Sequence, residues 1–549
     1  MTALPPHVVR HLTSLIPGRS DFTPAFANWR RDLLAGVTVG VVALPLALAF
    51  GVSSGMGAAA GLITAIVAGV VAAVFGGSNV QVSGPTGAMA VVLAPIVATL
   101  GPHAVIVISV LAGALLVAAG VLRLGRVVVY IPWPVIEGFT AGIAVVIFLQ
   151  QVPLAVDATG TTGERTVVAA WDAVVGADWT TAWVPLTVAL AVIAVIEGLR
   201  RVRRSLPGAL IAVVLATLVA ELAGLPVSRI GELPSHLPMP TFPQIDPAVL
   251  PTLVGPTVAV AALAAIESLL SARVAAGMAP TGPVQPDREV FGQGLASIVS
   301  GLFGGMPATG AIARTAVNVR AGGKSRLSAI VHALVLALVV AVGTGLASRI
   351  PLAALAGVLM STTIHMVNPH EVRALVRVSR SAAATFVVTI ACTVFLDLIT
   401  AVEIGVALAA FFALRALADT THVTREHLPG PAQPGDEHIA LLRMDGSLFF
   451  GVADRILEDV AEFDAHVVVL RLSAVGVFDS TGAHRLAEQI KMLESHGVAV
   501  LVKGLRKQHL KVAKHSGLLD ALGDRRCESL EEAVSRARAL VAREPNPAR

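Results

Sequence analysis

Two matching stretches of the chain decide the fold: Ser83-Gly-Pro-Thr-Gly-Ala-Met-Ala90 and Met306-Pro-Ala-Thr-Gly-Ala-Ile-Ala313. Both contain Thr-Gly-Ala, both follow a Gly-Gly pair, and both open an apolar run. In a chain this rich in Ala and Gly, chance similarity is the alternative explanation. The stretches nevertheless occupy the same position in each half of the chain. We therefore predict an internal repeat with two interrupted helices in matching positions.

An interrupted helix has a specific chemical use. Its first turn presents backbone N–H groups without intrahelical partners, together with the positive end of the helix dipole. Gly at such a start lets an anion approach the backbone, and Thr adds a hydroxyl donor. In membrane transporters, paired interrupted helices mark a substrate site near the midplane. The predicted substrate-binding residues are Thr86, Gly87 and Ala88 from the first stretch, and Thr309, Gly310 and Ala311 from the second.

Composition places these helices in a membrane. Of the 549 residues, 55% are hydrophobic and 14% are charged, whereas soluble domains have about 25% charged residues. These values exclude a single soluble globule, a disordered protein and a disulfide scaffold. The two cysteines, Cys392 and Cys527, lie in unlike surroundings and predict no bridge. The net charge of +4 fits basic cytoplasmic loops rather than nucleic-acid binding.

Hydropathy divides the chain near residue 420. We predict a cytoplasmic N-terminal segment (1–31), a transmembrane anion-transport domain (32–420), a Pro/Gly linker (421–436) and a cytoplasmic α/β domain (437–549). At roughly 20 residues per span, the membrane domain holds about 14 helices. Their predicted centres lie near residues 42, 68, 91, 112, 142, 190, 214, 261, 297, 317, 336, 356, 388 and 408. Two halves of seven spans are inverted relative to each other, because seven is odd.

Basic residues indicate the orientation in the membrane. With the N-terminus inside, the cytoplasmic loops carry most of the Arg and Lys, including the run Arg200-Arg-Val-Arg-Arg204. The opposite loops carry only Arg165, Arg229 and Arg349. The positive-inside rule therefore predicts a multi-pass protein of the plasma (inner) membrane with both termini cytoplasmic.

Two charged residues fall inside predicted spans. Arg314 follows the second stretch directly, and a guanidinium there can pair with a carboxylate or a tetrahedral oxyanion. Glu267 is the only carboxylate that we predict deep in a span near both stretches, which makes it a candidate proton or cation site. Ser268 and Ser271 follow within one turn, and we group them with Glu267 as coupling residues. The alternatives are an interfacial position for Arg314 and a structural pairing of Glu267 with Arg314.

Other polar residues carry weaker signals. Glu137 and Glu403 compete with Glu267 but lie nearer to predicted span ends, and no metal-ligand pattern surrounds His365 or His370. The chain shows neither a nucleophile–base–metal constellation nor a Walker lysine loop. We therefore predict no cofactor, no metal site, no enzymatic activity and no ATP-driven transport.

The chain resembles the SulP, or sulfate permease, family of anion transporters over nearly its whole length. The features that carry the resemblance are Ala43-Leu-Pro-Leu-Ala-Leu-Ala-Phe-Gly51, Gly84-Pro-Thr-Gly87, Ile266-Glu-Ser-Leu-Leu270 and Ala308-Thr-Gly-Ala-Ile-Ala-Arg-Thr315. The resemblance implies a seven-plus-seven inverted repeat with core and gate domains, and a homodimer. It also implies an anion site between the starts of the third and tenth spans, near the first and eighth.

Within that family, residues 41–89 are most similar to the bicarbonate-transporting branch. Sodium-dependent members have an Asp where this chain has Glu267, and Ile312 supplies no hydroxyl. Both departures favour proton coupling or exchange over sodium coupling. Arg314 is similar to the Arg of many anion-exchanging members.

The tail alternates strand-like and helix-like stretches, which is typical of an α/β layer domain. We predict strands at residues 439–444, 466–472 and 498–502, and helices at 483–494, 507–516 and 530–541. The tail resembles a STAS domain, centred on Phe478-Asp-Ser-Thr-Gly482. In related anti-sigma-factor antagonists the Ser of this turn is phosphorylated, which here is Ser480. Helix capping by Asp479 and Ser480 is the alternative role, and we favour it.

The leading interpretation is a secondary active transporter of small oxyanions such as bicarbonate, sulfate or a C4-dicarboxylate. It works by alternating access, with proton coupling or exchange. A sodium-coupled bicarbonate symporter and a passive anion channel are the alternatives, although a channel needs no coupling residue such as Glu267. A membrane-tethered signalling scaffold would need no anion site at the midplane.

Overall fold

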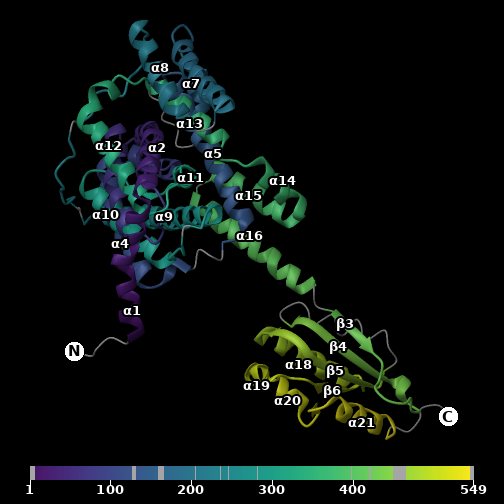
Figure 1. Cartoon of the computed structure of the whole chain (residues 1–549). Coiled ribbons are helices and arrows are strands. Elements are labelled where there is room, and N and C mark those ends of the chain that lie inside the picture. The colour runs from purple at the N-terminus through teal and green to yellow at the C-terminus, as the bar shows by residue number, and fades with distance from the viewer. Residues whose placement is uncertain are drawn as a thin grey trace. The chain divides into compact units, whose positions relative to one another are not determined.

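The computed structural model describes residues 6–126, 131–158, 166–203, 206–234, 236–244, 247–280, 282–396, 398–419, 422–448 and 465–543 (Figure 1). Arg165 and Arg204, which entered the orientation argument, lie outside these residues. The chain divides into two compact units, Met1–Ala407 and Leu408–Arg549. The first unit is helical, and the second contains an α/β sheet domain.

All fourteen predicted span centres fall within helices of the described chain. The helices of the membrane part are α1 (Pro6–Leu15), η1 (Arg19–Asp21), α2 (Thr23–Ser53), α3 (Ala58–Phe75), α4 (Gly87–Val121), α5 (Trp133–Ala155), α6 (Thr166–Val175), α7 (Trp183–Val202), α8 (Gly208–Leu222), α9 (Leu250–Met278), α10 (Pro286–Leu302), α11 (Ile312–Arg320), α12 (Arg326–Ala347), α13 (Leu352–Ile364), α14 (Pro369–Val378), α15 (Arg380–Phe395) and α16 (Leu398–Asp419). Nine helices among the described residues are long and apolar enough to cross a membrane.

Helix α4 accounts for two of the predicted centres. Gly101 has φ of 81° and breaks α4 into two helical pieces, with Pro102 starting the second. Only Gly adopts that backbone conformation without a steric penalty. The first piece is therefore a short half-helix, as the sequence predicts, and α11 is shorter still.

The helices pack into two groups. Helices α2, α3, α4, α9, α10, α11 and α12 contact one another, and α5, α7, α8, α13 and α15 form a second set. Small residues let the helices of the first group approach closely. A Cβ on Gly294 of α10 would lie 2.6 Å from the carbonyl oxygen of Gly113 on α4. A larger residue at this position would therefore force the two helices apart. This close packing fixes the frame around the interrupted helices.

The predicted N-terminal segment, residues 1–31, includes the first turns of a long helix. Helix α2 already begins at Thr23, and Asp21 just before it forms an ion pair with buried Arg288. The His11 imidazole lies 3.2 Å from the carbonyl oxygen of Gly120 at the end of α4. His11 and Asp21 therefore tie the described part of this segment to the helical bundle.

The two interrupted helices meet at a two-stranded crossing. Strand β1 (Ser83–Gly84) pairs antiparallel with β2 (Thr309–Gly310), so that Ser83 lies opposite Gly310 and Gly84 opposite Thr309. Helices α4 and α11 start directly after these strands. The predicted equivalence of Thr86 and Thr309 is wrong in structural terms. Thr86 is the N-cap of α4, whereas Ala311 is the N-cap of α11.

The tail forms a five-stranded sheet in the order β3-β4-β5-β6-β7. Its strands are β3 (His422–Glu426), β4 (Ile439–Leu448), β5 (Val467–Phe478), β6 (Ala499–Lys503) and β7 (Arg526–Cys527). Only the β3–β4 pair is antiparallel. The predicted linker over residues 421–436 is therefore wrong for 422–426, which form an edge strand of the sheet.

Successive side chains of a strand point to opposite faces of the sheet, and in the tail both faces carry an apolar core. Leu442, Val468 and Val500 pack against α18 (Ser480–Ser495) and α20 (Leu518–Leu522). Their neighbours Leu441, Val469 and Leu501 pack on the other face, against α21 (Leu530–Val541). The short η3 (Asp436–His438), η4 (Lys507–His509) and α19 (Leu510–His515) complete the domain. The three predicted strands and three predicted helices all have counterparts here.

Candidate anion site

Glu267 joins the two halves of the repeat. It lies on α9, and its Oε2 accepts hydrogen bonds of 2.8 Å from the hydroxyls of both Thr86 and Thr309. The two hydroxyl oxygens lie 3.1 Å apart. Thr86 Oγ1 also accepts from the Met89 N–H at 3.4 Å, which caps α4. The structure therefore brings the predicted coupling carboxylate onto the two threonines of the repeat.

Ser268 and Ser271 face protein groups instead. Ser268 Oγ accepts from the Gly310 N–H at 2.9 Å, and Ser271 Oγ donates to Thr315 Oγ1 at 3.1 Å. Thr315 Oγ1 in turn accepts from the Val82 N–H at 3.1 Å. Both serines are fully buried. Their contacts hold β2 and α11 against α9, so in this arrangement they position the site.

Arg314 is buried beside the crossing, with 2% of its surface exposed. Its Nη2 donates to the carbonyl oxygen of Pro85 at 2.5 Å, just before α4 begins. Within the described chain, its Nη1 has no hydrogen-bond partner. Because a buried donor without a partner is costly, this nitrogen is suited to bind an anion. Arg314 on the second half thus contacts the backbone of the first.

The helix starts supply further donors. The N–H groups of the first turn of a helix have no intrahelical acceptor. At the two helix starts, these groups include the N–H groups of Gly87 and Ala88 on α4 and of Ile312 and Ala313 on α11. Ala313 is exposed within this otherwise buried region. A Cβ on Gly87 would lie 2.2 Å from Ile147 Cδ1 of α5, so a larger residue there would displace that side chain. The site therefore combines two helix N-termini, one guanidinium and one carboxylate.

Gly84 allows Arg314 to reach this position. A Cβ on Gly84 would lie 2.8 Å from Arg314 Nη1 and 3.2 Å from Ala65 Cα. We expect Gly84→Ala to lower anion uptake about 10²-fold, the effect of a displacement of roughly 1 Å in a reacting group. Gly69→Ala is the matched control, because its new Cβ would make only ordinary contacts from 3.5 Å. Equal uptake by the two variants, at equal protein level in proteoliposomes, would contradict this account.

Three buried carboxylates escaped the sequence analysis. Asp287 and Glu289 of α10 and Asp32 of α2 are 7%, 1% and 0% exposed, so the helical bundle buries carboxylates besides Glu267. Asp32 accepts hydrogen bonds from the N–H groups of Lys324 and Ser325. Pro286-Asp-Arg-Glu289 is a dense polar start to a helix that is otherwise apolar and rich in Gly. That pattern was the available signal for Glu289.

The weaker candidates lie elsewhere. The Trp133 indole donates to Glu137 at 3.2 Å, Glu403 is exposed, and His365 contacts Glu197 at 2.7 Å. In the parts of the chain that the structure describes, no group of three His, Cys, Asp or Glu is placed to hold a metal ion. None of these residues contacts the crossing.

The tail turn is organised as a helix cap. Asp479 Oδ1 accepts from the Gly482 N–H at 2.7 Å at the start of α18. Ser480 is exposed in the first turn of that helix. Asp479 thus has the structural role that its position suggests, and the Ser480 hydroxyl stays on the surface.

Comparison with known proteins assigns the fold and this site to a family. The model of the sulfate permease family matches residues 29–389, which include both interrupted helices, Glu267 and Arg314. The chain belongs to the sulfate permease family. The STAS domain model matches residues 431–533, in the tail. The family and the STAS domain predicted from the sequence are therefore confirmed.

Sulfate permease relatives align with almost the entire chain. YvdB of Bacillus subtilis (strain 168), provisionally named a sulfate transporter, is 32% identical over 90% of this chain and 95% of its own. The bicarbonate transporter BicA of Synechocystis (strain PCC 6803) is 32% identical over 93% of this chain and 95% of its own. The solved structure of SLC26A9 superposes with a TM-score of 0.81 over 97% of this chain and 94% of that chain. Its 18% identity supports the fold alone.

Proposed function

We propose that this chain is a secondary active transporter of small oxyanions, which moves them by alternating access with proton coupling or anion exchange. Its sulfate permease relatives are named for sulfate and bicarbonate. These two anions are the first substrates to test, and a C4-dicarboxylate is the third. The observation that carries the proposal is Arg314 Nη1, which lies beside the starts of α4 and α11 and has no partner among the described residues.

The geometry suggests how binding and coupling are linked. An oxyanion at the two helix starts accepts from backbone N–H groups and from Arg314 Nη1. Glu267 lies on the same crossing through Thr86 and Thr309. Protonation of Glu267 and anion binding therefore each change the charge that the other experiences, and such coupling is reciprocal. Proton uptake at Glu267 is thus our candidate for the coupling step.

A panel of labelled anions in proteoliposomes tests this function. We expect saturable uptake of at least one oxyanion, driven by an inward proton gradient or by a counter-anion inside the vesicles. A strict sodium requirement would support the sodium-coupled bicarbonate alternative. Uptake that never exceeds equilibrium, and that a protonophore leaves unchanged, would support a passive channel.

The cellular arrangement is part of the same proposal. We place the chain in the plasma (inner) membrane as a multi-pass homodimer, with both termini in the cytoplasm. Its partners are the lipid bilayer, the small anion that it transports, and a coupling ion, which is a proton or a sodium ion. Cysteine labelling of the termini from either side of intact cells tests the orientation.

The tail should not determine which anion is carried. It shares no residue with the site, so removing it should change the rate, assembly or folding but not the order of preference among anions. The cut belongs at residue 420 rather than 437, because β3 would otherwise lose its partner β4. A changed order of preference in the uptake panel after deletion of residues 420–549 would contradict this division of roles.

A further inference from the structure

Residues 77–84 form a non-helical arm between α3 and the crossing. All of them except Asn79 are buried, and the arm ends in β1, directly before the start of α4. Non-helical backbone inside a membrane domain is stable only where protein groups satisfy its N–H and C=O groups. The partners of this arm therefore determine where Thr86 and the first helix start are held.

Glu289 is the main partner of the arm. Its Oε2 accepts from the N–H groups of Gly77 at 2.8 Å and Ser78 at 3.1 Å. Its Oε1 accepts from Gln81 Nε2 at 2.8 Å and Gln293 Nε2 at 3.0 Å. Four N–H donors thus converge on one buried carboxylate. A carboxylate satisfies all four donors because both of its oxygens accept hydrogen bonds.

The two glutamines extend this contact to both strands of the crossing. Gln293 Nε2 also donates to Ser83 Oγ of β1 at 2.5 Å. The Gln81 amide lies directly against Gly310 of β2, where an added Cβ would overlap it. The Gly310 N–H is bonded to Ser268, the neighbour of Glu267. Glu289 is therefore connected to β1 and β2 through one glutamine each.

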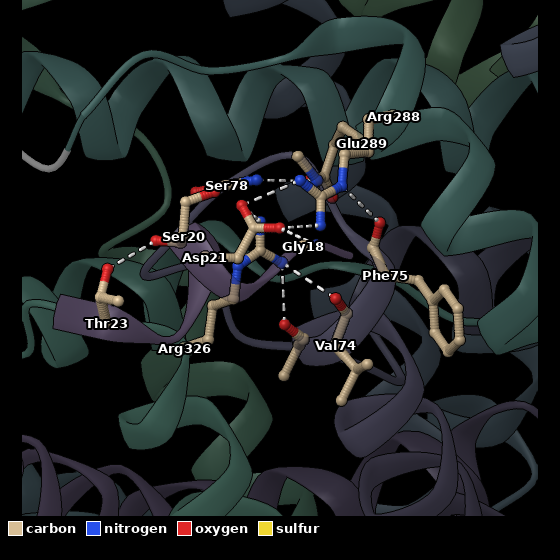
Figure 2. Close-up of polar contacts among 12 residues, drawn as sticks. Gly18, Ser20, Asp21, Thr23, Val74, Phe75, Ser78, Arg288, Glu289 and Arg326 are labelled. Carbon is tan, nitrogen blue, oxygen red and sulfur yellow. Dashed lines mark hydrogen bonds and ion pairs between the residues drawn. The ribbon is translucent and has the colours of Figure 1, made fainter. Parts of the chain in front are cut away.

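The residue before Glu289 fixes the other end of the arm. Figure 2 shows Arg288 and Arg326 beside the last turn of α3, where they donate to the carbonyl oxygens of Phe75 at 3.3 Å and Ala73 at 3.0 Å respectively. Asp21 forms ion pairs with both cations and accepts two hydrogen bonds from Arg288, at 3.0 and 2.9 Å. The end of α3 thus has cationic anchors of its own, separate from the hydrogen bonds that Glu289 makes with the arm.

We propose that Glu289 is a positioning residue for the anion site, which acts through Gln81 and Gln293 to set the β1–β2 crossing. The proposal rests on the proposed function, because it assumes that anions bind at that crossing. It assigns Glu289 no contact with the anion. Its effect is on how well Thr86, Thr309 and the two helix starts are placed before the anion arrives.

Glu289→Gln tests the proposal with little change in shape. A Gln side chain carries one acceptor oxygen and one NH₂ group, so two of the four donors must face another donor. We expect the KM for the transported anion to rise about tenfold, equivalent to ~1.4 kcal/mol, with a smaller change in maximal rate. Gln81→Ala should raise KM in the same way, and it tests the link even if Glu289→Gln folds poorly.

The double variant shows whether both residues act in one network. If Glu289 works through Gln81, the KM of Glu289→Gln with Gln81→Ala should be close to that of the worse single variant, because the effects of coupled residues do not add. Multiplied effects would mean independent roles and would overturn the proposal. So would an unchanged KM in both single variants.

Asp32→Asn is the matched control. Asp32 is an equally buried carboxylate in the same bundle and also accepts backbone N–H groups, but it caps the start of α12 and does not contact the arm. It should lower thermal stability and leave KM unchanged. A KM rise equal to that of Glu289→Gln would mean general loosening and would overturn the proposal.

Failure of the proposed function gives a different result. A parent protein without saturable uptake of any anion would contradict the function. Amide hydrogen exchange would then still test the positioning role. Residues 77–84 should exchange faster in Glu289→Gln than in the parent or in Asp32→Asn, and equal protection would overturn the role of Glu289.

Discussion

Arg314→Ala should abolish anion uptake while the protein stays folded. The change removes the buried guanidinium whose Nη1 has no partner among the described residues, and the bond from Nη2 to Pro85. Truncating one partner of a buried charged contact typically costs about 2–5 kcal/mol, so uptake should fall by about 30-fold to 4,000-fold on the same energy scale. The measurement is initial uptake into proteoliposomes at matched protein content, with thermal unfolding to verify the fold.

Two variants sharpen the test of Arg314. Arg314→Lys keeps the positive charge but loses the planar fork, so uptake should be weak rather than absent. Arg320→Ala removes an exposed Arg from the end of the same helix and should leave uptake near that of the parent. Normal uptake by a well-folded Arg314→Ala protein would refute the anion site.

Glu267→Gln should separate anion binding from proton coupling. Gln keeps an oxygen that can accept from the hydroxyls of Thr86 and Thr309, so the crossing should persist. It cannot gain or lose a proton. Anion binding and exchange should therefore survive, whereas the stimulation of uptake by an inward proton gradient should disappear. The measurement is uptake at several external pH values with sodium held constant.

Glu403→Gln is the control for the loss of a carboxylate from a membrane helix. Glu403 is exposed on α16 and makes no contact with the crossing, so its variant should keep the proton-gradient dependence of the parent. If Glu267→Gln also kept that dependence, Glu267 would have no part in coupling. If it no longer bound anion, its role would be structural.

The sequence predicts the helices well because each has a local cause. Runs of apolar residues place all fourteen centres, and the Thr-Gly-Ala stretches locate the two interrupted helices. Glu267 and Arg314 are visible as charges in apolar surroundings. Their proximity to the crossing follows from the repeat, because matching positions in an inverted repeat meet near the midplane.

What the sequence does not predict depends on contacts between distant residues. The bonds of Glu289 to Gly77, Ser78 and Gln81 span more than 200 positions, and no local pattern indicates them. Strand β3 is missed because a short polar edge strand next to a Pro/Gly segment looks like a linker until its partner β4 is known. The start of α11 is misplaced by two residues because Thr309 pairs in a strand with Gly84 instead of capping the helix.

The unlike caps of the two interrupted helices break the symmetry of the duplicated fold. Thr86 satisfies an N–H group of its own helix, whereas Ala311, in the same place on α11, has no side chain that can do so. The helix start of the second copy therefore has no side-chain cap, and the second copy also carries Arg314. In the alternating-access mechanism that we propose, a duplicated frame can keep its pseudo-twofold relation while one copy specialises in holding the anion.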